Sequence, residues 1–143
     1  MEKLSSTIFF QLDRAIKSYR QFAQKKLTEK GYSITVDQWL VLKTITDQPD
    51  ISQNEIAEFI FKDKASVTRI IDLLISKGYL QREVAAENRR RVKLTITRSG
   101  KNLIQQIMPT IKGYRKSALV GVTDTELDSM YKTLAKFIKN CSK

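Results

Sequence analysis

The sequence predicts a mainly α-helical fold with one small β-hairpin, and three patterns indicate it. Apolar residues recur every three or four positions over most of the chain, which is the period of an amphipathic helix. Ser, Thr or Asp residues stand as caps before these stretches, and glycines follow some of them. Residues 79–96 instead alternate apolar and polar side chains on both sides of a charged segment, as the strands of a hairpin do.

Two helices are expected before residue 50. The first covers residues 5–30 and ends at Gly31, which tolerates the left-handed backbone of a helix end. Thr35 and Gln38 have the spacing of a capping box and open the second helix, which ends before the segment 48–50.

A pair of short helices follows. Ser52 and Glu55 repeat the capping-box spacing, and Asp63 is the expected cap of a helix that ends at Gly78. The inward face of the first short helix is expected to hold Ile56, Ala57, Phe59 and Ile60. Two short helices joined by a tight turn form a helix-turn-helix.

The hairpin and two long helices complete the chain. Strands are expected at residues 79–84 and 92–96, with the polar segment 85–91 as the loop between them. Thr97 is the expected cap of one helix, and the pair Thr123 and Glu126 opens the last one. This order of elements predicts a winged helix-turn-helix flanked by N- and C-terminal dimerisation helices.

The apolar stripes of the terminal helices exceed what a small winged helix needs to cover its core. They are therefore expected to pack against each other and against a second copy of the chain, although an ordinary core within one chain fits the same pattern. The stripe contains Leu12, Ile16, Tyr19, Leu127, Tyr131, Leu134 and Ile138.

Charge is strongly positive and unevenly distributed. The 143 residues carry a formal net charge of +11, and residues 77–101 contain eight basic and two acidic side chains. Clustered positive charge creates a local field that attracts phosphate groups, so a nucleic acid is the expected partner. The length suits a single domain covering residues 1–143.

Several function classes are excluded by what the chain lacks. It has no histidine, and Cys141 is its only cysteine, so the usual general base and the usual zinc ligands are missing. No glycine-rich phosphate loop is present either, and we therefore expect neither an enzyme nor a cofactor. No apolar stretch is long enough to span a membrane, and a single cysteine suits a reducing compartment, so a cytoplasmic location is expected.

Two sets of residues are candidates for contact with double-stranded DNA. The second helix of a helix-turn-helix enters the major groove, and its early outward residues here are Lys64, Ala65, Ser66, Thr68 and Arg69, with Ser52 and Gln53 at the start of the motif. The wing offers Asn88, Arg89, Arg90 and Arg91, and arginine suits the electronegative minor groove. Both sets could instead be solvated polar surfaces, and a winged-helix adaptor that binds protein is the alternative function.

Four motifs together resemble the MarR family of bacterial transcription regulators. The segment 52–58 resembles the family's first motif helix and 63–69 its recognition-helix start, while 77–80 and 94–100 resemble the segments that lead into and out of the wing. Two positions depart from the family pattern. Phe61 stands where the turn often has glycine, and Asn88 stands where an aspartate often braces a wing arginine, a role that could pass to Glu87.

The resemblance implies a homodimer that binds a pseudo-palindromic operator, usually as a repressor, and that a small aromatic or phenolic ligand releases. It also implies dimerisation helices in residues 1–34 and 100–143, around a DNA-binding core in residues 35–99. Aromatic residues that could line a ligand pocket are Phe10, Tyr19, Tyr32 and Trp39, although aromatics at helical spacing are more often core residues.

Overall fold

The computed structural model describes residues 1–85 and 88–143, with the side chains of residues 85 and 88–91 outside that description. A short 3-10 turn, Leu4–Ser6, precedes α1 (Ile8–Glu29) and α2 (Val36–Asp47). The helix-turn-helix consists of α3 (Gln53–Phe59) and α4 (Lys64–Ser76). The antiparallel hairpin of β1 (Leu80–Ala85) and β2 (Asn88–Ile96) leads into α5 (Arg98–Ala118) and α6 (Asp124–Cys141). The predicted fold class is therefore confirmed.

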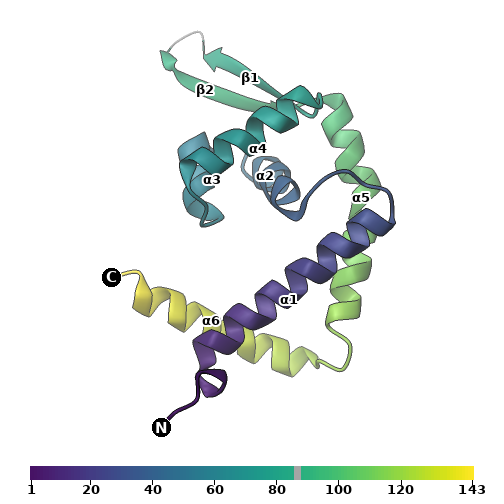
Figure 1. Cartoon of the computed structure of the whole chain (residues 1–143). Helices are drawn as coiled ribbons and strands as arrows, with labels where there is room; N and C mark the ends of the chain where they lie inside the picture. Colours follow the sequence, from purple (N-terminus) through teal and green to yellow (C-terminus); the bar gives the residue numbers. More distant parts are fainter. Residues whose placement is uncertain (86–87) are drawn as a thin grey trace.

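The chain forms two parts joined by α5. Figure 1 shows the helix-turn-helix, α2 and the hairpin in the upper part, with α5 running down one side to the lower part, where α1 and α6 cross. Both termini lie in the lower part (Figure 1). This arrangement leaves α4 and the hairpin together, away from the chain ends.

Local capping signals set the helix boundaries. Capping boxes form at Thr35, Ser52 and Thr123, where the side chain accepts from the backbone N–H three residues later and that residue's side chain accepts from the cap's N–H. Asp63 and Thr97 cap α4 and α5 in the simpler way, by accepting one backbone N–H. These caps agree with the sequence prediction.

The junction between the hairpin and α5 is tightly packed around Gly100. A Cβ atom at this position would lie 2.3 Å from the carbonyl oxygen of Tyr79, so only glycine fits. Thr97 strengthens the junction, because its hydroxyl donates to the carbonyl of Gly78 at 2.5 Å. The helix-turn-helix exit and the start of α5 are thereby held together.

One core fills the upper part and the crossing of α1 with α5. Its fully buried side chains come from α1, α2, α3, α4, β1 and α5, and include Leu27, Leu42, Ile56, Ile71, Leu74, Leu80, Ile107 and Ile111. Every residue of α6 is described, and none of them is buried. The last helix therefore contributes nothing to the core of this chain.

Two local expectations were wrong. Phe59 was expected to face inward but is 61% exposed, because the stripe of Ile56, Ala57 and Ile60 already occupies the face of α3 that packs on α4. Strand β2 begins at Asn88 rather than Val92, so the backbone of residues 88–91 belongs to a strand and not to a loop. Alternation of apolar and polar residues could not reveal a strand segment made of polar residues alone.

Candidate nucleic-acid interface

The exposed start of α4 carries a chain of hydrogen bonds. The Asp63 carboxylate accepts from the Ser66 hydroxyl at 2.7 Å and from the Ser66 backbone N–H at 2.8 Å. Together these bonds lower the pKa of Asp63, with the hydroxyl as the larger cause. Arg69 donates from Nη2 to the Ser66 Oγ at 3.1 Å, so its guanidinium is held on the outer surface of the helix.

A second set of bonds fixes α4 against the start of α3. Gln53 donates from Nε2 to the Thr68 Oγ1 at 2.6 Å, and the Thr68 hydroxyl donates to the carbonyl of Lys64 at 2.9 Å. Ser52 caps α3 and thereby positions Gln53 one residue later. The two residues predicted at the start of the motif therefore support the helix that was predicted to read DNA.

The predicted recognition residues share one side of α4. Lys64, Ala65 and Arg69 are exposed, and Ser66 and Thr68 are half-buried. The opposite side of α4, with Val67, Ile71 and Leu74, is buried in the core. The side chains that face outward at this helix start can thus donate hydrogen bonds through an ammonium, a guanidinium and two hydroxyls.

The wing is tied to α4 by an ion pair that the sequence did not indicate. Arg82 in β1 contacts Asp72 in α4, with 3.1 Å between Nη2 and Oδ1. The sequence shows only that neighbouring elements carry opposite charges. Whether these charges pair depends on how the hairpin packs against α4. The pair adds a polar contact between β1 and α4, beside the buried Leu80 that anchors the hairpin to the core.

The hairpin register changes near its end. Residues pair regularly from Leu80 with Ile96 to Val84 with Val92, and Ala85 then pairs with Asn88. Residues 89–91 stand in β2 at this irregularity, and their side chains lie outside the described residues, as does the whole of Glu87. The role of Asn88 and the three arginines in DNA binding therefore stays a prediction.

The turn between α3 and α4 has an unusual backbone. Phe61 has a φ of +56°, in the left-handed region where glycine is normally found, and its side chain is 94% exposed. Its neighbour Lys62 forms an ion pair with Asp37 at 3.0 Å, and Asp37 also accepts a hydrogen bond from Arg20. This charged cluster connects the turn to the start of α2 and to α1.

The four aromatic residues predicted around a ligand lie in different surroundings. Trp39 is 3% exposed and belongs to the core, while Tyr19 and Tyr32 are half-buried against it. The Tyr32 hydroxyl donates to the carbonyl of Gln106 at 3.0 Å, and Phe10 is half-buried on α1. Their part in ligand binding stays a prediction.

No group of three or more potential metal ligands occurs among residues 1–85 and 88–143. In the same described part of the chain, none of the helices has the length and apolar character needed to cross a membrane.

The comparisons with known proteins agree with one another on one family of regulators. The sequence model of the MarR family matches residues 34–92, which run from the start of α2 through the helix-turn-helix into β2. The structure of the transcriptional regulator SlyA is 26% identical and superposes with a TM-score of 0.84 over 96% of this chain and 95% of that one.

Two other solved structures show the same fold. A MarR/EmrR family transcriptional regulator from Acinetobacter sp. ADP1 has 19% identity and a TM-score of 0.88, over 98% of both chains. BpsR of Bordetella bronchiseptica, whose DNA binding is regulated by 6-hydroxynicotinic acid, has 23% identity and a TM-score of 0.85, over 96% of both chains. The family match and these neighbours confirm the resemblance seen in the sequence motifs: the MarR family model matches residues 34–92, and the chain has the winged-helix fold of MarR-family transcriptional regulators.

Proposed function

We propose that this chain is a sequence-specific regulator that binds double-stranded DNA as a homodimer and acts as a repressor. The observation that carries the proposal is the organised polar start of α4, where Arg69, Ser66 and Asp63 form one hydrogen-bonded chain on the exposed side. The Asp63–Ser66 bonds cap the helix, and the additional bond from Arg69 to Ser66 holds the guanidinium on the exposed side. Held side chains lose less conformational entropy when they bind a base edge.

In this proposal α4 enters the major groove. A helix fits that groove, and a guanidinium can donate two parallel hydrogen bonds to guanine. Arg69 is the residue we assign to base contact, while Lys64 and the Ser66 hydroxyl bind phosphate or base edges and the Ala65 methyl faces thymine. Because Gln53 holds Thr68, a change at Gln53 would shift these contacts without touching DNA directly.

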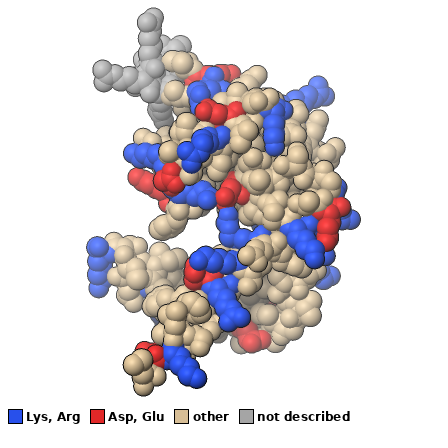
Figure 2. Space-filling view, viewed as in Figure 1, with Lys and Arg blue, Asp and Glu red and all other residues tan. Residues whose placement is uncertain are grey.

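The wing arginines supply the second contact. We assign Arg90 to the minor groove, with Arg89 and Arg91 beside it, because the narrow groove concentrates negative potential. Figure 2 shows basic side chains interspersed with acidic ones on the visible face of the upper part.

A second copy of the chain would cover the lower part. Its exposed apolar side chains lie at the N-terminal end, between α5 and α6, and along α6, and they include Leu4, Ile8, Phe9, Ile16, Leu119, Val120, Val122, Met130, Tyr131 and Ile138. Apolar surface of this extent is typical of an interface between subunits. A symmetric dimer would present two α4 helices to two half-sites of one operator.

We further infer that a small aromatic or phenolic ligand releases the DNA. The support is the regulation of BpsR by 6-hydroxynicotinic acid in a protein of the same fold. The residues proposed to line this pocket remain Phe10, Tyr19, Tyr32 and Trp39.

The experiment that tests the DNA-binding proposal is selection from a random pool of duplexes, followed by affinity measurements at several salt concentrations. We expect a palindromic site to be enriched. Arg90→Ala should weaken binding to all sequences and reduce the salt slope by about 1, because one phosphate-neutralising charge is lost. Arg69→Ala should reduce discrimination at one base pair by about 1–3 kcal/mol.

Arg14→Ala is the matched control, since this exposed arginine lies on α1 away from α4 and the wing. It should change neither specificity nor salt slope. Absence of any enriched sequence, with equal binding by all three variants, would contradict the proposal and leave the protein-binding adaptor as the better interpretation.

A further inference from the structure

The turn between α3 and α4 has the hydrogen bonds of a Schellman motif. The Lys62 N–H donates to the carbonyl of Ala57 at 2.9 Å, and the Phe61 N–H donates to that of Glu58 at 3.3 Å. Two residues depart from the usual composition of this motif. Phe61 has a left-handed backbone where glycine is common, and Lys62 stands where an apolar side chain often packs on the preceding helix. A strained backbone of this kind persists only when the surrounding structure holds it.

The Lys62 side chain finds its partner outside the motif. Its Nζ lies 3.0 Å from Oδ2 of Asp37, which stands in the first turn of α2. The other carboxylate oxygen of Asp37, Oδ1, accepts a hydrogen bond from Nη2 of Arg20 in α1. The three side chains are 29–35% exposed, so water and salt screen these ion pairs less than pairs on an open surface. One carboxylate thus joins α1, the start of α2 and the turn before α4.

A second contact holds the start of α2 on α1. The Oε1 of Gln24, one turn after Arg20, accepts from the Val36 N–H at 3.0 Å. This N–H belongs to the first turn of α2 and has no acceptor within its own helix. Asp37 follows Val36 directly, so its backbone is placed by α1 before its side chain reaches Lys62.

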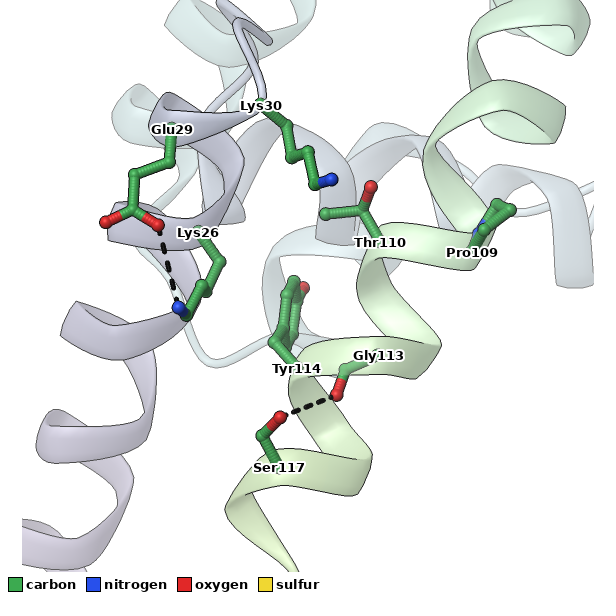
Figure 3. Close-up of a pocket in the computed structure, with 8 residues that line it drawn as sticks. All are labelled: Lys26, Glu29, Lys30, Pro109, Thr110, Gly113, Tyr114 and Ser117. Atoms are coloured by element: carbon green, nitrogen blue, oxygen red, sulfur yellow. Dashed lines mark hydrogen bonds and ion pairs between the residues drawn. The ribbon is translucent and has the colours of Figure 1, made fainter.

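Helix α1 is itself fixed in the core. Ala23 and Leu27, one and two turns after Arg20, are fully buried. The Tyr19 ring packs edge-on against Tyr114 of α5, with 5.9 Å between the centroids. Figure 3 shows the last turns of α1 beside the middle of α5, with Tyr114 between the two helices. Arg20 therefore belongs to a helix that packs firmly on α5.

We propose that Asp37 is a positioning residue for DNA recognition. By pairing with Lys62 and Arg20 it fixes the turn, and with it the start of α4, relative to α1. This inference rests on the proposed function, in which α4 reads DNA and a second copy covers the lower part. Two half-sites are read together only at the correct spacing, so a loosened turn should weaken specific binding more than nonspecific binding.

The first arm of the test uses the full-length protein without DNA and follows amide hydrogen exchange by NMR. Asp37→Asn removes the charge and keeps the shape of the side chain. The Lys62 and Ser66 amides, in the turn and at the start of α4, should then exchange about fivefold faster, because local opening becomes easier. Asp47→Asn is the matched control, since Asp47 lies on the same helix and pairs only locally with Lys43. It should leave both amides unchanged.

Two further variants separate the ion pair from other effects of Asp37. Lys62→Gln removes the pair but leaves the carboxylate at the start of α2, where the helix dipole favours it. It should speed exchange of the Ser66 amide as Asp37→Asn does, and the double variant should exchange no faster than the faster single one. Asp37→Glu keeps the charge and should restore most of the protection.

The second arm measures affinity for the selected duplex and for a random-sequence duplex. Asp37→Asn should weaken binding to the selected duplex about fivefold and to the random duplex less than about twofold. Asp37→Glu should bind the selected duplex within about twofold of the parent, and Asp47→Asn should match the parent. A purely structural loss would lower both affinities together.

The overall amide spectrum shows whether each variant folds, and Lys62→Gln carries both arms if Asp37→Asn does not fold. Unchanged exchange at Lys62 and Ser66 in Asp37→Asn, or at Ser66 in Lys62→Gln, would overturn the proposal, as would equal losses for the two duplexes. A parent that selects no sequence would refute the proposed function instead. The exchange arm would still decide whether Asp37 holds the turn.

Discussion

The upper part of the molecule buries its apolar side chains within the chain, whereas the lower part leaves most of them exposed. In α4, Val67, Ile71 and Leu74 are buried, and the polar residues occupy the other side. In α6 the apolar residues also form one stripe, but none of them is buried and Ile138 is 66% exposed. Phe9 of α1 contacts Phe137 of α6, with 5.1 Å between the ring centroids. This contact buries far less apolar surface than the whole stripe of α6 could bury.

The same amphipathic pattern therefore serves two purposes in this chain. A stripe that meets its partner inside the chain stabilises the fold of one copy, and a stripe without an internal partner favours association of two copies. The helix proposed to read DNA is accordingly held by the chain itself. The spacing between two such helices would be set by the lower part.

Variants in the two parts should differ most in whether their loss of stability depends on protein concentration. Ile71→Ala should lower the free energy of unfolding by about 2–5 kcal/mol, because it opens a cavity among fully buried side chains. This loss should be the same at all protein concentrations in urea unfolding. Ile138→Ala should instead act only where dimers form, so its effect should vary with concentration. A concentration-independent effect of equal size at both positions would refute the distinction.

A smaller effect concerns the turn that positions α4. Phe61→Gly should raise the free energy of unfolding by about 1 kcal/mol, because glycine adopts the positive φ of this position without the strain of a Cβ atom. Phe61→Ala distinguishes the loss of the ring from the relief of backbone strain, because it removes the ring and keeps a Cβ atom at this positive φ. Urea unfolding of the two variants measures both contributions. Equal stability of the glycine and alanine variants would show that the backbone conformation is not strained.

The smallest effect is a pH dependence at the cap of α4. Because hydrogen bonds from Ser66 lower the folded-state pKa of Asp63, its carboxylate stabilises the fold at neutral pH and loses this contribution as the pH falls through the lowered value. Asp63→Asn retains a capping oxygen but has no charge to titrate. The difference in melting temperature between parent and variant should therefore shrink in acid. A difference that stays constant down to the acid limit of folding would exclude this role for the charge.

Local features of the fold could be predicted from the sequence, because their signals lie within a few residues of each other. The capping boxes at Thr35, Ser52 and Thr123 and the cap at Asp63 follow from short-range spacing, and all four are present. The helix-turn-helix and the flanking helices follow from these boundaries and from apolar periodicity.

Features that depend on packing between distant elements could not be predicted. The Arg82–Asp72 ion pair requires the hairpin to lie against α4. The exposure of Phe59 likewise depends on which side of α3 meets α4. The proposed DNA contacts of Arg69 and the wing arginines remain predictions, because they concern a partner molecule.

Sedimentation equilibrium of the parent and of Ile138→Asp tests whether the lower part joins two copies of the chain. We expect twice the chain mass of 16.5 kDa for the parent at about 10 μM, and one chain mass for the variant with its helix content retained. Lys136→Asp, on the polar side of the same helix, should remain a dimer. A parent that sediments as a single chain, or an Ile138→Asp variant that stays dimeric, would show that this surface does not join two copies.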